Sequence, residues 1–338
     1  MPAMPNRSYP RLDAVLLVAG LVLVAACSEG GRQGLTTPTI PTTAAGGTAT
    51  TTVRSRNRIT IQHRGFEAGG GSGIVASSRR PGVFWAVRDR GGVDRPGQPQ
   101  NALYAFKVVG GEPADVAPGF RDTAVELPVQ SHDWEAIGRD DDGNLWVGDI
   151  GNNECDRADT AVHKVREPDP GSLELATVLA TYRYRFPDPP PGCAGRNAEA
   201  MFLFENRPYI IDKSDQSTVY RFPKLDPDKP VTLERVGTMA GGVRMLSGAD
   251  LSADKRLLAV DTHTALYIYR SGNPKLRGRA FVADMISRPP RWTIPLERPG
   301  ASMPVNVEGV AFDHDSQDLT LLAENRDLFF VPAAAYQR

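Results

Sequence analysis

Short apolar runs separated by turns rich in Asp, Asn and Gly recur from about residue 70 to the end of the chain. Runs of this length between turn residues predict β-strands, and signals for helices are nearly absent. In four places a carboxylate stands at the head of one run, and a second run follows after a turn. The four carboxylates are Glu135, Glu199, Asp250 and Glu308, and Gly73 stands at the matching position of an earlier unit.

Most of these units also contain a third and a fourth apolar run. Four antiparallel strands repeated about every 50–60 residues predict the blades of a single all-β propeller. We count five blades, and the last has room for only three strands. Residues 58–62 are predicted to supply its outer strand, which closes the ring and removes its free edges. Six blades are the alternative if residues 271–303 contain another short blade, and two separate β domains are a third reading.

The N-terminal residues resemble an export signal. Arg7 and Arg11 precede an apolar run over residues 14–24, which is too short for a comfortable membrane span. The run ends in Val24-Ala25-Ala26-Cys27, which resembles a bacterial lipobox. We therefore expect residues 1–26 to be a lipoprotein signal peptide and Cys27 to carry a lipid such as palmitate. The protein would then be extracytoplasmic and anchored to the cell membrane; an ordinary secretion signal with a chance cysteine is the alternative.

Residues 27–56 are rich in Thr, Pro and Gly and contain few charges. Such a segment cannot bury a core, so it is predicted to be a disordered tether. The propeller domain would then span residues 57–338. The formal net charge of −1 gives no electrostatic support for nucleic-acid binding. We expect a monomer.

Two cysteines, Cys155 and Cys193, remain after Cys27. An exported compartment favours a disulfide between them, and two free thiols are the alternative. Their spacing does not match that of a zinc site.

The first strand of each propeller blade lines a central channel, so residues at matched positions form a ring. Glu135, Glu199, Asp250 and Glu308 are therefore expected to meet at one mouth, with Asn197 and Asn306 pointing the same way. Converging carboxylates repel one another unless a cation is present, and oxygen ligands suit Ca²⁺. A calcium site is predicted. The alternatives are acids that accept backbone or arginine hydrogen bonds, and acids that share protons for catalysis.

Polar residues also follow the second strand of several units. Asp149, Asn152 and Asn153 lie in one Gly-containing turn, and Lys213 lies at a matching place. These side chains are candidates for binding a protein or small-molecule ligand over the channel. Turn formation alone is the other interpretation, since Asn, Asp and Gly favour tight turns.

Residues 133–137, residues 145–153, Arg157 and residues 165–168 together resemble a family of exported bacterial β-propeller proteins. Many members are lipoproteins, and the family is distantly similar to calcium-dependent lactonase and esterase propellers of the paraoxonase type. The resemblance implies a propeller fold over residues 70–338 and a calcium-dependent activity. The chain departs from the family pattern at Asn152-Asn153, where an acid followed by Asn is usual.

Two functions follow from these observations. The first is a lipid-anchored binding or scaffold module with a divalent-metal site at the channel mouth. The second is a calcium-dependent hydrolase of an ester or a lactone, with His132 or His263 as the base. A serine hydrolase is disfavoured, because no Gly-x-Ser-x-Gly motif is present.

Overall fold

A computed structural model describes residues 51–52, 60–62, 70–89, 99–296 and 306–337 of the chain. The chain divides into two units, Met1–Gly47 and Thr48–Arg338, and all described residues belong to the second. The predicted signal peptide and Cys27 lie outside the described residues. The described part contains no helix that is long and apolar enough to cross a membrane.

Five small sheets form the second unit, and consecutive strands of each sheet pair mainly antiparallel. The first sheet contains β3 (Gly71–Ala76), β4 (Val83–Arg88), β5 (Ala102–Val109), β6 (Glu112–Ala114) and β7 (Asp122–Glu126). The second contains β8 (Trp134–Arg139), β9 (Leu145–Asp149), β10 (Ala161–Val165), β11 (Val178–Arg185) and β15 (Val231–Thr232). The third contains β12 (Ala198–Phe204), β13 (Arg207–Asp212), β14 (Thr218–Arg221) and β16 (Glu234–Thr238).

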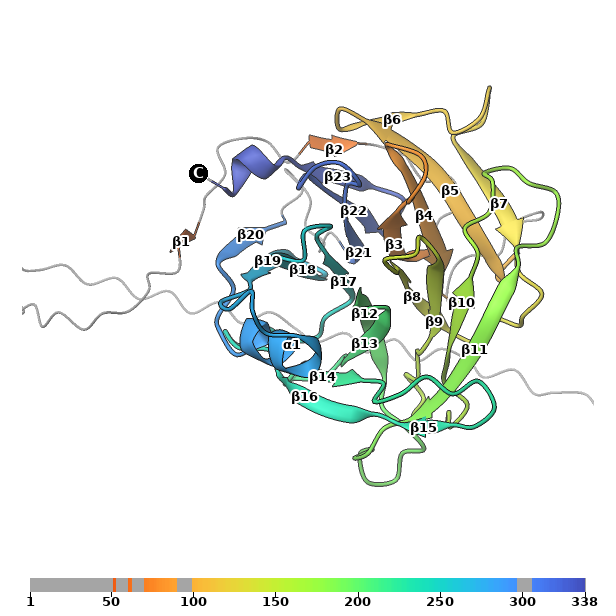
Figure 1. Cartoon of the computed structure of the whole chain (residues 1–338). Coiled ribbons are helices and arrows are strands. Elements are labelled where there is room, and N and C mark those ends of the chain that lie inside the picture. Colours follow the sequence, from red (N-terminus) through yellow and green to blue (C-terminus); the bar gives the residue numbers. More distant parts are fainter. Residues whose placement is uncertain (1–50, 53–59, 63–69, 90–98, 297–305, 338) are drawn as a thin grey trace, which may run out of the picture. The chain divides into compact units, whose positions relative to one another are not determined.

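The fourth and fifth sheets follow the same order. The fourth contains β17 (Gly248–Leu251), β18 (Leu257–Thr262), β19 (Ala265–Arg270), β20 (Trp292–Pro295) and β1 (Thr51–Thr52). The fifth contains β21 (Val307–Phe312), β22 (Leu319–Ala323), β23 (Leu328–Val331) and β2 (Thr60–Gln62). The five first strands contact one another in cyclic order, β3, β8, β12, β17 and β21. The predicted five-bladed propeller is confirmed, and Figure 1 shows its blades around the common axis.

An N-terminal strand closes the ring, as predicted. Strand β2 pairs antiparallel with β23, with Thr60 opposite Phe330 and Gln62 opposite Leu328. This pairing completes the last blade and covers the edge of β23. The two-residue strand β1 pairs in parallel with β20, although it lies within the stretch predicted to be a disordered tether.

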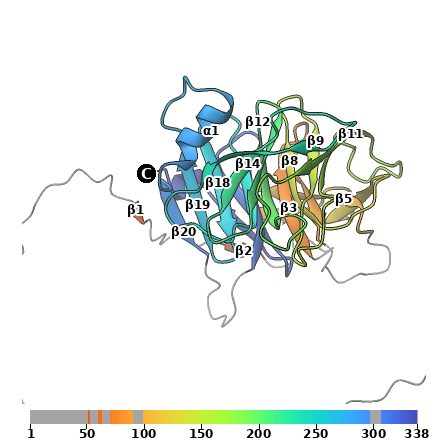
Figure 2. The ribbon, with the colours of Figure 1, turned by 90° about the horizontal axis from the view of Figure 1, so that it is seen from below.

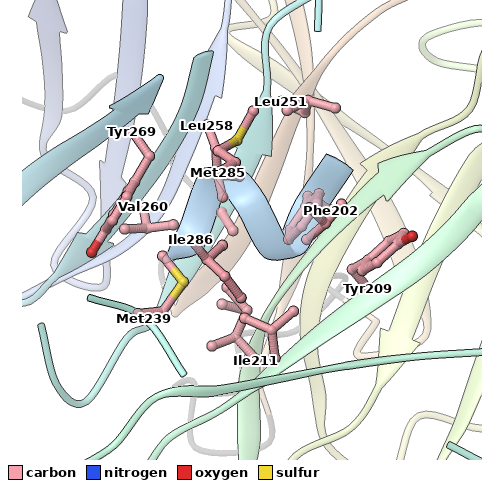
Figure 3. Packing of buried hydrophobic residues seen from close by; sticks show 14 of the residues in the cluster. Phe202, Tyr209, Ile211, Met239, Leu251, Leu258, Val260, Tyr269, Met285 and Ile286 are labelled. Atoms are coloured by element: carbon pink, nitrogen blue, oxygen red, sulfur yellow. The ribbon is translucent and has the colours of Figure 1, made fainter. Parts of the chain in front are cut away.

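The alternative of six blades is wrong. Between β19 and β20 the chain forms helix α1 (Gly278–Ile286) instead of a short blade. Its apolar residues recur at helical spacing, and Phe281 stacks on Phe204 of the third blade with ring centroids 4.6 Å apart. Figure 3 shows Met285 and Ile286 of the helix packed among the buried side chains of the third and fourth blades. Figure 2 shows α1 covering one end of these blades.

The core consists of five apolar clusters, and each fills the space between two neighbouring blades. Along the axis the first strands approach one another very closely. An added Cβ at Gly73 of β3 would lie 2.7 Å from Ala136 Cα of β8. The inner strands therefore pack backbone against backbone, and this arrangement fixes the positions of the side chains at both ends of the channel.

Candidate functional site

The channel has two ends, which we call the first and the second mouth. The first mouth lies where the five first strands begin and where β4, β9, β13, β18 and β22 end. The second mouth lies at the turns that join each first strand to the next. Glu135, Glu199 and Glu308 lie at the first mouth, as predicted, and each occupies a shift in the strand register. Trp134 pairs with Asp149 and Ala136 with Gly148, so Glu135 is the extra residue of a β-bulge, a device that redirects a side chain.

The charges of Glu199 and Glu308 are met by two basic side chains. The Lys213 ammonium forms an ion pair with Glu199 and lies 3.5 Å from His263 Nε2. His263 Nε2 lies 3.1 Å from Glu308 Oε1, and this hydrogen bond raises the pKa of His263. Burial lowers the pKa of Lys213, but the attraction of Glu199, Glu308 and Glu135 outweighs it and raises that pKa above its usual value. Lys213 was predicted only as a ligand-binding residue beside the ring, whereas its ammonium lies among the carboxylates.

The pKa values of two glutamates at the first mouth, Glu199 and Glu135, are both raised. Burial raises the pKa of Glu199, and the Lys213 ammonium offsets this only in part. Burial, followed by repulsion from Glu199 and Asp133, raises the pKa of Glu135 well above its usual range. Ser72 Oγ lies 2.9 Å from the Glu135 carbonyl oxygen and 2.8 Å from its Oε2. A hydroxyl has one hydrogen, so both bonds form together only when Glu135 carries a proton.

Asp250 does not join the three glutamates, and its predicted place in the ring is wrong. It pairs with Ala259, two residues deeper along the sheet than the first-mouth pair Gly248–Asp261. Its neighbouring charges are Arg139 and Lys255, on the side of the second mouth. The fourth blade has no bulge at this place, so a sequence alignment on the carboxylates misassigned its register.

The glycine position in the first blade leaves no gap to the centre of the channel. Gly73 packs against the backbone of Ala136 and Ile137. In this blade Ser72 faces Glu135 and occupies the position of the missing acid.

Asp261, near the end of β18, is a further carboxyl of the first mouth. It takes the same register position as Asp149, next to the first residue of the neighbouring strand. It is fully buried, and its Oδ1 has no hydrogen-bond partner. Ser247 Oγ lies 3.0 Å from Asp261 Oδ2 and 3.0 Å from the Val307 carbonyl oxygen, so this hydroxyl also bridges both acceptors only when the acid is protonated. Burial raises the pKa of Asp261 to about 8.

We expect Asp261→Asn to stabilise the fold by about 2 kcal/mol at pH 8. In the unfolded chain this acid loses its proton near pH 4, while in the folded chain it keeps the proton up to about pH 8. Its contribution to stability is therefore present below about pH 4 and is lost as the pH rises toward 8. Urea unfolding at pH 4, 6 and 8 tests this, with exposed Asp215→Asn as the control. A variant that is less stable than the wild type at pH 8 would contradict the protonated state.

The polar turn after β9 is held rigidly at the first mouth. Arg157 Nη2 lies 2.7 Å from Asp149 Oδ1, and the backbone N–H of Asn152 donates to Asn197 Oδ1 over 2.7 Å. Asn197 Nδ2 in turn donates to Asn153 Oδ1 over 2.8 Å. Asp149 and Asn152 therefore build the turn, whereas Asn153 and Asn197 extend from it beside Glu199.

Two further predictions concern this region. The disulfide between Cys155 and Cys193 is confirmed, with Cα atoms 4.9 Å apart, and it ties the turn after β9 to the loop that leads into β12. Asn306 donates from Nδ2 to Glu324 at the head of the fifth blade. Of the two candidate bases, His263 contacts the glutamates, whereas His132 Nδ1 lies 2.9 Å from Asp159 Oδ2 at the rim.

The calcium prediction can be compared with this geometry. In the described part of the chain, no three His, Cys, Asp or Glu side chains converge closely enough to hold a metal ion. The Lys213 ammonium lies where an ion bound to Glu199 would lie. Glu199 pairs with Lys213, and Glu308 bonds to His263. Beside them lie Glu135 and Asp261, whose pKa values are raised. A calcium site at this mouth stays a prediction.

No known family model matches the chain, and no curated protein matches its sequence. Among solved structures it is similar to the glutaminyl cyclase of Myxococcus xanthus, with 11% identity, a TM-score of 0.46, and coverage of 80% of this chain and 91% of that chain. A chain of a mitotic checkpoint complex has 13% identity and a TM-score of 0.37, covering 90% of this chain and 99% of that chain. A catalytically inactive variant of the virginiamycin B lyase of Staphylococcus aureus, with quinupristin, has 10% identity and a TM-score of 0.36, covering 77% of this chain and 65% of that chain. We infer no function from these likenesses.

Proposed function

We propose that the chain is a lipid-anchored, extracytoplasmic binding module whose first mouth binds a small organic cation that carries an alkylammonium group. One observation carries the proposal: the Lys213 ammonium forms an ion pair with Glu199, and Glu308 and Glu135, from two other blades, lie close enough to help raise the pKa of Lys213. The site thus already contains an alkylammonium as part of the protein. Carboxylates with raised pKa values gain from a further positive charge, which displaces their protons.

The proposal favours an organic ammonium over the predicted calcium ion. A bare Ca²⁺ requires six to eight oxygen ligands, and the glutamates here are spread over ion pairs and serine hydrogen bonds. An ammonium needs only two or three acceptors, and it tolerates Lys213 as a neighbour if a glutamate lies between them. The amide groups of Asn153 and Asn197 supply further polar contacts at the rim.

The lipid anchor on Cys27 supports a role at the cell surface rather than in bulk solution. A rigid ring on a tether presents its mouth and loops to molecules outside the membrane, and this suits a binding or scaffold module. Anchoring, the monomeric state and a protein partner are proposals that rest on the sequence alone.

A calorimetric titration of the full chain tests the binding proposal. The probes are pentane-1,5-diamine, CaCl₂ and, as the uncharged control, pentan-1-ol. We expect the diamine to bind, about tenfold more weakly in Glu199→Gln, and more tightly at pH 8 than at pH 5 because bound protons must leave. The exposed Glu174→Gln should bind as the wild type does.

Equal binding of pentan-1-ol and the diamine would contradict a cation site, as would the absence of heat with the diamine. Calcium binding without diamine binding would show that the first mouth binds the metal that the sequence predicts and not an organic cation.

A hydrolase of an ester or a lactone is the second candidate, and one observation favours it. Burial and repulsion from Glu199 raise the pKa of Glu135, whereas Glu199 is paired with Lys213, and two neighbouring acids with different proton affinities are the arrangement that acid–base catalysis uses. An ester and lactone panel, assayed with the same protein and with Glu135→Gln, separates the two functions. Turnover by the wild type that stops in the variant would establish the hydrolase.

A further inference from the structure

The second mouth contains a cavity of 370 Å³ at the opposite end of the channel. Four blades contribute to it through the turns after their first strands. The residues that matter here are Arg139, Asp141, Asp250, Lys255 and His314. The volume lies in the range of small-molecule sites.

Arg139 is held in place by one of its terminal nitrogens. Its Nη1 donates to the carbonyl oxygen of Ser77 over 3.1 Å, lies 3.4 Å from that of Ala76, and lies 3.4 Å from His314 Nδ1. Within the described residues Arg139 has no carboxylate partner at ion-pair distance. The edge formed by Nε and Nη2 is the one with which arginine binds a carboxylate side-on through two hydrogen bonds.

Asp250 presents the opposite charge to the same cavity. Its Oδ1 accepts the backbone N–H of Leu251 over 2.9 Å, and its Oδ2 accepts that of Phe312 over 2.9 Å. These bonds fix the carboxylate and leave further lone pairs on each oxygen. Asp250 also has no ion-pair partner in the described ranges. Burial raises its pKa to about 6, so it is mostly ionised at neutral pH.

Of the other acids that line the cavity, Asp141 and Asp140 form ion pairs with lysines, and Asp142 accepts a hydrogen bond from Asn206. Lys255 Nζ lies 2.7 Å from Asp141 Oδ1. His314 accepts from Arg139 at Nδ1 only in its uncharged form. One guanidinium and one carboxylate, fixed separately and not paired with each other, therefore face a cavity of small-molecule size.

We propose that the second mouth binds a free α-amino acid, with the ligand carboxylate on Arg139 and the ligand ammonium on Asp250. A zwitterion supplies both missing partners at once, whereas a simple anion or cation satisfies one charge and leaves the other desolvated.

The second mouth is independent of the first. Between them the channel narrows to a cavity of only 10 Å³, lined by glycines, by apolar side chains and, on the side of the first mouth, by Glu199. This space holds one water at most. In addition, Glu135 and Arg139 stand four residues apart on the same strand, which separates them by about 13 Å.

The test uses the full chain and nuclear magnetic resonance or calorimetric titration with the twenty amino acids. Propionate is alanine without its ammonium, and ethylamine is alanine without its carboxylate. These two compounds serve as single-charge probes. We expect at least one amino acid to bind and each half-molecule to bind at least about tenfold more weakly. Arg139→Met and Asp250→Asn should each weaken binding of the amino acid about tenfold or more.

Controls separate this site from the first mouth and from misfolding. Glu199→Gln and the exposed Arg288→Met should leave amino-acid binding unchanged. Arg139→Lys, which keeps the charge and loses the planar fork, should bind with intermediate affinity, and thermal melts show which variants are folded. The proposal is overturned if no amino acid binds, if propionate binds as tightly as the amino acid, or if folded Arg139→Met or Arg139→Lys binds as the wild type does.

Discussion

Gly73→Ala is expected to lower the free energy of unfolding by about 3 kcal/mol. The added Cβ would lie 2.6 Å from Ile137 N and 2.7 Å from Ala136 Cα, and both are backbone atoms of the neighbouring blade. A flexible side chain can move aside, but here a whole strand of the ring has to shift. The same strand contains Ser72, so the hydrogen bond to Glu135 should also be disturbed. Urea unfolding followed by tryptophan fluorescence measures the loss.

Gly237→Ala is the matched control for this prediction. It also lies in a strand, but its added Cβ would meet only Ile286 side-chain atoms, at 3.4 Å or more. We expect a change within about 1 kcal/mol in either direction. Equal effects at the two positions would contradict the close packing of β3 on β8.

Lys213→Met is expected to destabilise the fold by about 3 kcal/mol at pH 8. The side chains of Lys213 and Glu199 are only 13% and 5% exposed, so removal of the ammonium leaves a buried carboxylate beside Glu135 and Glu308. Without the ammonium, the pKa of Glu199 rises further, and uptake of a proton by Glu199 stabilises the folded variant. The penalty should therefore shrink as the pH falls from 8 to 5, because protonation removes the uncompensated charge.

Unfolding at pH 5 and pH 8 tests this dependence, with Lys224→Met as the control. Lys224 is 69% exposed and pairs only with Asp226, so we expect a change below about 0.5 kcal/mol at both pH values. A penalty for Lys213→Met that does not change with pH would mean that the lysine stem, rather than its charge, supports the mouth.

The sequence predicted the architecture well because strand period and turn chemistry are local properties. The five blades and the closing strand over residues 60–62 follow from such patterns, whereas the disulfide follows from the cysteine count and the expected export. Helix α1 was missed because its apolar residues were interpreted as strand or loop. The packing of Phe281 on Phe204 of the third blade shows that these apolar residues form the buried face of a helix.

The candidate site could be predicted only in part, because its side chains depend on shifts in the strand register. Three bulges bring Glu135, Glu199 and Glu308 into the first mouth, and the fourth blade lacks such a bulge. A single extra residue in a strand leaves no clear mark in the amino-acid sequence. Asp250 was therefore aligned with the wrong end of the channel.

Lys213 shows a second limit of the sequence. A lysine at the end of a strand is usually predicted to lie in solvent at the rim. Whether its ammonium reaches into the ring depends on the length of the side chain and on the position of the next blade. The ion pair with Glu199 also changes the chemistry, since it places an ammonium where the carboxylates alone suggested a metal.

Titration of Lys213→Met with pentane-1,5-diamine tests most directly whether the first mouth is a site for an alkylammonium. Removal of the Lys213 ammonium leaves Glu199 without its internal partner, so the diamine should bind about tenfold more tightly than to the wild type at pH 8. The same titration should raise the thermal midpoint of the variant toward that of the wild type. Unchanged or weaker binding to a folded Lys213→Met would contradict the cation site.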